Sequence, residues 1–232
     1  MKFIQHAMSP PEEIGANVWN AIDAGAPFVH VVDLPFNGMS PSESERYIKD
    51  LAGSIGRTTL TAGVPDTEIW RLNRTTSPST QFIPYHTDNP YLGVPEKVVS
   101  FWNVKSSSQG GANLILPVND LLEWADSKPE YKDTLQEIED TPVAFSHGLE
   151  STVGRLLEPI SGSARFDMKY MDETAKLLGN IFRTILNDPE VPAQTVKLSE
   201  GDVLFFDNEK TLHARNEYSD LARVSLRVRM AR

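Results

Sequence analysis

The chain has no cysteine among its 232 residues. That absence excludes a disulfide framework, a thiolate metal site and a cysteine nucleophile, so any metal must be held by histidine, aspartate or glutamate. The chain also lacks an apolar run long enough to cross a bilayer, and its start, MKFIQHAMSPPEE, lacks the apolar core of a secretory signal. We therefore expect a cytoplasmic protein without a membrane partner.

Positive charge is scarce as well. The 22 Lys and Arg residues face 32 Asp and Glu residues, which gives a formal net charge of -10. A protein of this sign repels a nucleic-acid backbone and an anionic membrane, so a small molecule is the expected partner. The length and the 40% hydrophobic content predict one globular domain over residues 1–232. Nothing in the sequence indicates an oligomeric state.

Apolar spacing and capping signals predict four helices. The first begins after Ser9 and runs toward Gly25, and the second begins at Ser40, where Glu43 completes a capping box, and ends near Gly53. The other two are expected over 118–127 and 172–187. Short β-branched runs predict strands over 28–34, over several segments of 58–116 of which 96–105 is the clearest, and in the tail.

The tail predicts two strands joined by a tight Asp-Asn turn at 207–208, then a loop and a final strand in ARVSLRVRMAR. In that final strand Arg223, Ser225, Arg227 and Arg229 alternate with apolar residues, so they share one face. One interpretation is an edge strand with its arginines in water. The other is that the arginine and the hydroxyl at 223 and 225 form a receptor for a carboxylate.

A histidine and an aspartate stand one residue apart in PYHTDNPYL, residues 84–92. Successive side chains of a strand point to opposite faces, so His86 and Asp88 should project to one side while Thr87 points away. His213, in a strand-like segment after the Asp-Asn turn, is the candidate third ligand. Two histidines and one carboxylate form the facial triad of non-heme Fe(II) oxygenases, which keeps coordination positions open. A lone His-x-Asp is also common in turns that bind no metal.

The order and spacing of these residues are those of a known family. Over residues 80–230 the chain resembles the Fe(II)/2-oxoglutarate-dependent oxygenases, in particular the taurine dioxygenase and clavaminate synthase-like group. The matching segments are H-T-D followed by N-P-Y, the double glycine of QGGANLILP, GDVLFFDNEKTLHAR and the basic last strand. The resemblance implies a mixed β fold with α, namely a double-stranded β-helix (jelly roll, cupin-like) core with flanking helices and iron in the barrel mouth.

The resemblance also implies roles for individual residues. His86, Asp88 and His213 match the iron ligands. Arg223 matches the arginine that holds the distal carboxylate of 2-oxoglutarate, and Ser225 is placed to assist it.

Four further positions carry weaker implied roles. Asn113 stands where the family usually has a Thr or Ser that contacts 2-oxoglutarate. Arg227 corresponds to a position where some relatives bind an acidic group of the primary substrate, with a surface salt bridge as the alternative. Arg71 and Arg74 lie where relatives have a mobile active-site lid and are candidates for substrate binding, with solvated loop arginines as the alternative.

The activity implied is that of a dioxygenase using Fe(II), 2-oxoglutarate and O2. It would oxidise an unactivated C–H bond of a small anionic or amino-acid-like molecule in a biosynthetic role, releasing succinate and CO2. Hydroxylation is the expected reaction, with desaturation, cyclisation and epoxidation open. A cupin-like metal-binding protein without oxygenase activity would keep the three ligands but not need Arg223. A histone-type demethylase would share the triad, and a structural interaction module would need no metal.

Overall fold

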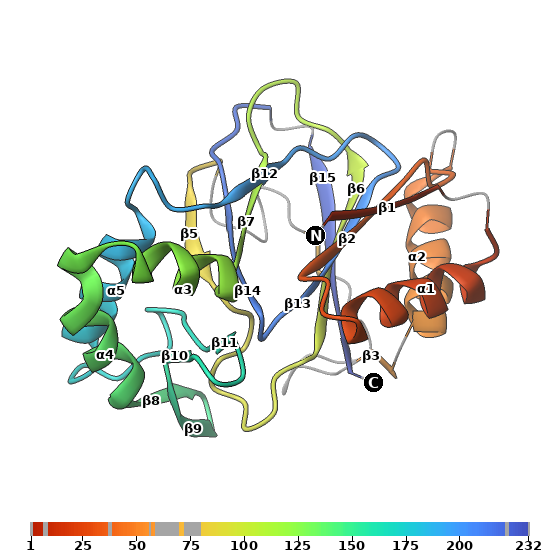
Figure 1. Ribbon diagram of the computed structural model, residues 1–232. Helices are drawn as coiled ribbons and strands as arrows, with labels where there is room; N and C mark the ends of the chain where they lie inside the picture. The colour runs from red at the N-terminus through yellow and green to blue at the C-terminus, as the bar shows by residue number, and fades with distance from the viewer. Residues whose placement is uncertain are drawn as a thin grey trace.

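The computed structural model describes residues 2–6, 9–36, 39–55, 57–58, 70–71, 80–220 and 223–231. It is a mixed α/β structure in which two main sheets face each other and helices cover their outer sides, as Figure 1 shows. Strands β1 and β2 pair in parallel, and the other strand pairs of both sheets are antiparallel. Among the residues described, no helix is long and apolar enough to cross a bilayer.

The larger sheet has seven strands in the order β1-β2-β13-β6-β15-β3, and β4 also pairs with β15. These strands are β1 (Lys2–His6), β2 (Phe28–Val32), β13 (Val203–Asp207), β6 (Val98–Lys105), β15 (Val224–Ala231), β3 (Arg57–Thr58) and β4 (Trp70–Arg71). The smaller sheet has the order β12-β7-β14-β5. Its strands are β12 (Gln194–Val196), β7 (Asn113–Pro117), β14 (Thr211–Arg215) and β5 (Ile83–His86).

Helices and two short strand pairs complete the architecture. Helices α1 (Pro11–Asp23) and α2 (Pro41–Ile55) cover the larger sheet, and α3 (Val118–Asp126), a 3-10 turn (Pro129–Tyr131), α4 (Lys132–Asp140) and α5 (Lys176–Leu186) lie on the side of the smaller one. The strand pairs are β8 (Pro142–His147) with β9 (Glu150–Arg155) and β10 (Leu157–Glu158) with β11 (Ser163–Ala164).

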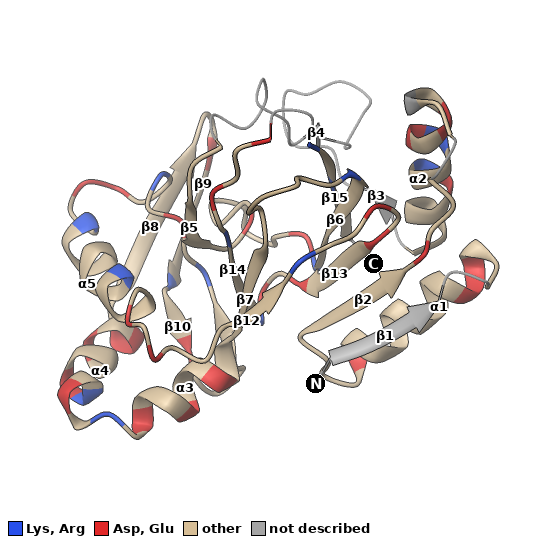
Figure 2. Ribbon diagram, turned by 90° about the horizontal axis from the view of Figure 1, so that it is seen from above, with Lys and Arg blue, Asp and Glu red and all other residues tan. Residues whose placement is uncertain are grey.

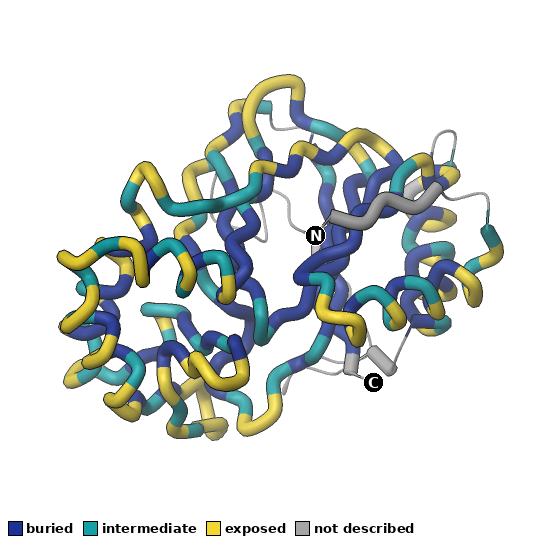
Figure 3. Tube along the Cα trace, viewed as in Figure 1, coloured by how far each residue is buried: buried dark blue, intermediate teal, exposed yellow. Residues whose placement is uncertain are grey.

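Three clusters of buried apolar residues join these layers. One packs α1 and α2 against the outer face of the larger sheet, and another packs α3, α4 and α5 against the smaller sheet. The third lies between the sheets, and Figure 3 shows how strongly burial is concentrated in their strands. Its members are Phe28, Val99, Phe101, Ile115, Val196, Leu198, Leu204 and Phe206. These side chains fill one part of the space between the sheets and leave a polar site in the rest.

Charge is distributed unevenly between the surface and this inter-sheet space. Figure 2 shows acidic residues along the outer helices α1, α3 and α4. Two arginines near the ends of β15 are instead buried: Arg223, just before the strand, and Arg229 within it are each 5% exposed. Because β15 lies between β6 on one side and β3 and β4 on the other, the edge-strand interpretation of this segment is wrong.

The elements expected from local patterns are confirmed where the structure describes them, with two corrections, while residues 59–69 and 72–79 of the strand-rich segment lie outside the described residues. Helix α2 begins where its capping box predicts, because the Ser40 backbone N–H donates to Glu43 Oε2 at 2.7 Å and the Glu43 N–H donates to Ser40 Oγ at 3.3 Å. Helix α5 begins only at Lys176, four residues after the predicted start. Strands β13 and β14 do flank the Asp-Asn turn, but they pair into different sheets rather than with each other: β13 pairs with β2 and β6, and β14 pairs with β5 and β7.

Loss of the capping box should destabilise the protein measurably. We expect Ser40→Ala to lower the free energy of unfolding by about 1 kcal/mol, since it leaves a helix N–H without its acceptor. Urea unfolding measures the change, and Ser151→Ala, at an exposed site of β9, is the matched control. Equal stabilities of the two variants would contradict the role of the cap.

Candidate metal centre

His86, Asp88 and His213 converge at one point, as predicted from the sequence. His86 ends β5, and His213 lies directly opposite it in the middle of β14. One ligand atom from each of the three residues lies within 4.8 Å of the other two. Asp88 Oδ1 is 3.8 Å from His86 Nε2 and 3.9 Å from His213 Nε2. The route differs from the prediction: β5 stops at His86, so Asp88 reaches the point from the following loop rather than by strand alternation.

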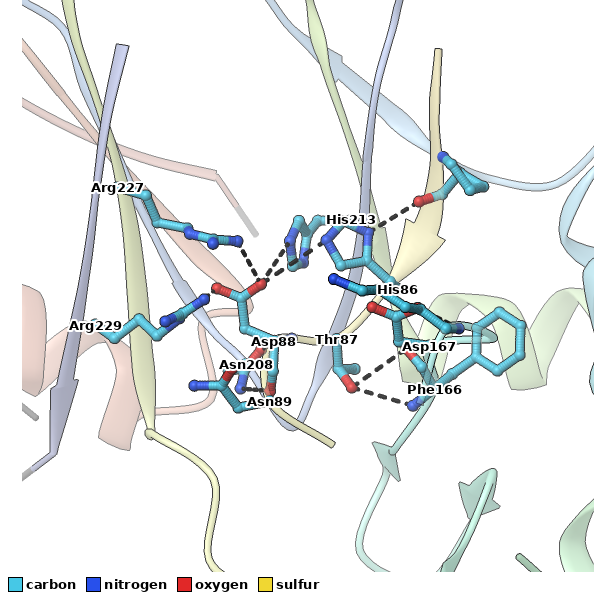
Figure 4. Close-up of polar contacts among 12 residues, drawn as sticks. His86, Thr87, Asp88, Asn89, Phe166, Asp167, Asn208, His213, Arg227 and Arg229 are labelled. Atoms are coloured by element: carbon cyan, nitrogen blue, oxygen red, sulfur yellow. Dashed lines mark hydrogen bonds and ion pairs between the residues drawn. The ribbon is translucent and has the colours of Figure 1, made fainter. Parts of the chain in front are cut away.

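The backbone of Asp88 is fixed by Asn208, which follows β13. The Asp88 N–H donates to Asn208 Oδ1 at 2.8 Å, and Asn208 Nδ2 donates back to the Asp88 carbonyl at 3.0 Å and to the Glu96 carbonyl at 3.2 Å. Asn208 is only 1% exposed, so these bonds are shielded from water. One amide side chain thus fastens the aspartate loop to the turn that joins the two sheets (Figure 4).

Thr87 points away from the centre, as the alternation argument predicted, and has a contact of its own. The Thr87 N–H donates to the Phe166 carbonyl at 2.7 Å, and the Phe166 N–H donates to Thr87 Oγ1 at 3.0 Å. This pair of bonds brings the next residue, Asp167, beside His86 (Figure 4). His86 and Asp167 line a cavity of about 140 Å³ together with Tyr85 and others.

Two arginines of β15 hold the Asp88 carboxylate. Arg227 Nη1 lies 2.9 Å from Oδ1, and Arg229 Nε lies 2.9 Å from Oδ2. Burial by itself would raise the pKa of Asp88, but Arg227 and Arg229, with smaller contributions from the histidines, hold it well below its ordinary value. The carboxylate is therefore ionised at neutral pH. Arg227 does form a salt bridge, as the alternative expected, but with a partner that is 3% exposed, and its predicted role in substrate binding stays a prediction.

Each of the two histidines has a ring nitrogen that can face the centre. His213 is 2% exposed and packs against Phe101 and Phe206, with ring centroids 5.5 and 4.6 Å away. Burial, followed by the neighbouring His86, places the pKa of His213 well below its ordinary value. His86 Nδ1 lies 2.9 Å from the Pro84 carbonyl, which leaves its Nε2 for the centre.

This donor set fits a divalent metal ion. Both ring nitrogens of His213 are buried without a hydrogen-bond partner among the described residues, a costly arrangement that a metal ion at Nε2 would relieve in part. Each oxygen of an ionised carboxylate has two acceptor sites, so Asp88 Oδ1 can accept from Arg227 and still bind a metal. Two neutral imidazoles and one carboxylate are the ligands expected for non-heme Fe(II).

A second cluster of polar residues surrounds Arg223, which directly precedes β15. The Arg223 guanidinium lies over the Tyr218 ring, 5.1 Å from its centroid, and Arg215 lies 4.6 Å from the same centroid. Within the part of the chain that the structure describes, Arg223 Nη1 and Ser225 Oγ are buried and have no hydrogen-bond partner. Gly111, with φ +74, allows the chain to pass close by, since a Cβ there would lie 3.4 Å from Arg223 Nε. Burial lowers the pKa of Arg223, and a bound carboxylate would offset that cost.

The remaining predicted residues divide into two groups. Asn113 is buried in β7, and its Nδ2 donates to the Val196 carbonyl at the long distance of 3.5 Å, so its predicted role in binding stays a prediction. Arg71 lies in β4, whose backbone pairs with β15. Arg74 lies outside the described residues.

Three residues of this centre, Arg229, Asn208 and Asp167, were not predicted from the sequence. Arg229 could have been found, because it shares the strand face of Arg223 and Arg227. Asn208 and Asp167 carry no such local signal, since each reaches the centre through a contact between segments far apart in the chain.

No protein-family model matches the chain, and no characterised protein matches it in sequence. Solved structures do match. An asparagine oxygenase in complex with Fe(II), 2S,3S-3-hydroxyasparagine and succinate has a TM-score of 0.72 at 13% identity, covering 94% of this chain and 79% of that chain.

Two other solved structures give the same result. PvcB from Pseudomonas aeruginosa has a TM-score of 0.69 at 16% identity, covering 99% of this chain and 86% of that chain. OrfP, a non-heme iron oxygenase in complex with Fe and alpha-ketoglutaric acid, has a TM-score of 0.68 at 12% identity, covering 95% and 80%. The chain has the fold of the Fe(II)/2-oxoglutarate-dependent oxygenases. The resemblance inferred from its motifs is confirmed at the level of the fold.

Removal of the Asn208 side chain should loosen the centre. We expect Asn208→Ala to lower the free energy of unfolding by about 1–3 kcal/mol, because it leaves buried backbone groups of Asp88 and Glu96 unpaired. Chemical denaturation measures this, with Asn187→Ala, at an exposed position after α5, as control. A variant as stable as the control would show that the clamp contributes nothing.

Proposed function

We propose that this protein is an Fe(II)/2-oxoglutarate-dependent oxygenase that oxidises, by default hydroxylates, a C–H bond of a small amino-acid-like molecule. The observation that carries the proposal is the meeting of His86, Asp88 and His213 within 4.8 Å of one another on a fold shared with such oxygenases. We assign the core as a double-stranded β-helix. The strand orders of the two facing sheets, in which consecutive strands β13 and β14 alternate between sheets, support that assignment.

The co-substrate would be held between two groups of residues. With Fe(II) bound by His86, Asp88 and His213, the metal supplies O2 activation coupled to oxidative decarboxylation of 2-oxoglutarate, which yields succinate and CO2. The guanidinium of Arg223 would pair with the distal carboxylate, with Ser225 Oγ as a second donor. Arg223 Nη1 and Ser225 Oγ are both buried, and neither has a hydrogen-bond partner among the described residues, as expected of a site that binds an anion.

The substrate would enter beside His86 and Arg227. Their side chains are 17% and 19% exposed, whereas those of Asp88 and His213 are 3% and 2% exposed, so the centre opens on that side. The opening offers a cation and a carboxyl group, because Arg227 lies beside it and Asp167, whose pKa burial raises, accepts a hydrogen bond from the Lys169 N–H at 2.9 Å. A carboxylate and an ammonium group on one small molecule would complement this pair.

A cupin-like metal protein without oxygenase activity is the second candidate. It is supported by the same convergence of His86, Asp88 and His213, which by itself requires no 2-oxoglutarate. Such a protein would have no use for Arg223 as an anion receptor, so the two candidates differ in their response to 2-oxoglutarate. Desaturation or cyclisation differs from hydroxylation only in how the substrate is held.

Anaerobic addition of Fe(II) and 2-oxoglutarate should produce the visible charge-transfer band of an iron-bound keto acid. We expect Asp88→Ala to abolish the band and turnover, because it removes the carboxylate ligand and leaves two guanidiniums at the centre. The control is Asp133→Ala, at an exposed position of α4, which should retain both. Turnover by Asp88→Ala would mean that the ligand set is wrong.

Arg223→Met should act on 2-oxoglutarate alone. Loss of a charged hydrogen bond of about 1.5–3 kcal/mol predicts a KM for 2-oxoglutarate raised by about 10- to 100-fold, with a much smaller change in Fe(II) affinity. Steady-state kinetics measure the first and anaerobic titration the second, and Arg155→Met, exposed on β9, is the control. An unchanged KM would favour the cupin-like alternative.

A further inference from the structure

We propose that Arg229 is a positioning residue of the metal centre, which fixes the Asp88 carboxylate so that it presents one oxygen to the metal. The inference rests on the proposed function, since it takes His86, Asp88 and His213 as ligands. The two carboxylate oxygens of Asp88 have different surroundings. Oδ1 lies 3.8 and 3.9 Å from the two histidine Nε2 atoms, whereas Oδ2 receives Arg229 Nε at 2.9 Å.

Arg229 is held more firmly than the other arginine on Asp88. Its donor is Nε, which three side-chain torsions place, whereas Arg227 uses Nη1, which a fourth torsion also moves. The Arg229 side chain is 7% exposed and that of Arg227 19%. Arg229 also lies in the field of Glu96, a buried carboxylate whose two oxygens each accept a hydrogen bond from Asn89 Nδ2 at 3.0 Å.

A fixed carboxylate keeps a coordination position open. A free aspartate can rotate about its Cβ–Cγ bond and bind a metal through both oxygens, which uses a position that the facial triad leaves for co-substrate or O2. With Oδ2 bonded to Arg229, only Oδ1 faces the histidines. Carboxylate ligands are generally oriented by such outer contacts, and loss of the contact typically costs about 10- to 100-fold in metal affinity.

The charge of Arg229 has the opposite effect on metal affinity. A guanidinium close to a metal dication repels it, so removing that charge alone would strengthen metal binding. Orientation and charge therefore predict changes of opposite sign for Arg229→Met. For Arg229→Lys, which keeps the charge but loses the Nε donor, orientation predicts weaker binding and charge predicts no change.

The test is an anaerobic Co(II) titration of the full chain, followed by visible absorption. We expect both Arg229→Lys and Arg229→Met to bind Co(II) about 10- to 100-fold more weakly than the wild type. We also expect the Co(II) d–d bands to lose molar absorptivity, because a carboxylate that binds through both oxygens raises the coordination number. Arg155→Met, at an exposed position of β9, should match the wild type.

Each other outcome has a definite meaning. Wild-type affinity and spectrum in Arg229→Lys, or tighter binding in Arg229→Met, would overturn the positioning role while leaving the proposed function intact. Absence of Co(II) binding by the wild type would overturn the proposed function and this inference with it. Should Arg229→Met fail to fold, as judged by circular dichroism, Arg229→Lys decides the question by itself.

Discussion

The ion pairing of Asp88 is the constraint on which the rest of the site depends. A carboxylate that is 3% exposed is stable as an anion only where opposite charge compensates its lost hydration, and Arg227 and Arg229 provide that compensation. Arg229 is itself buried and Arg227 is partly buried, so their charges need the carboxylate as it needs them. The result is a compact charged group in which no member can be removed without stranding another.

The fold brings this group together by alternating consecutive strands between the sheets. Because β13 lies in the larger sheet and β14 in the smaller one, the turn at Asn208 crosses the molecule next to the loop of Asp88. The same crossing places His213 opposite His86, while β15 brings its arginines from the facing sheet. Each ligand therefore comes from a rigid element or is hydrogen-bonded to one, which suits a centre that must keep its geometry.

The site separates into regions with different chemistry. Arg223, just before β15, and Ser225 are buried and are the proposed receptor for a carboxylate, His86, Asp88 and His213 are the candidate metal ligands, and Arg227 is the more exposed of the two arginines on Asp88. An oxoacid anchored at the first region and chelated at the second would leave the third to the substrate. The apolar cluster between the sheets, with Phe101 and Phe206 against His213, closes the remaining side to water.

Local sequence determined the capping box of α2, the strands around the Asp-Asn turn, the shared face of the β15 arginines and the candidate ligands His86, Asp88 and His213. Hydrogen bonding and periodicity act within a few residues, so such features can be recognised in the chain itself. Tertiary structure alone decided that β13 and β14 pair into different sheets, that β15 lies inside its sheet, and that Arg229, Asn208 and Asp167 belong to the centre. Strand partners and burial follow from which distant apolar surfaces pack together, and that choice is made by the whole chain rather than by any short segment.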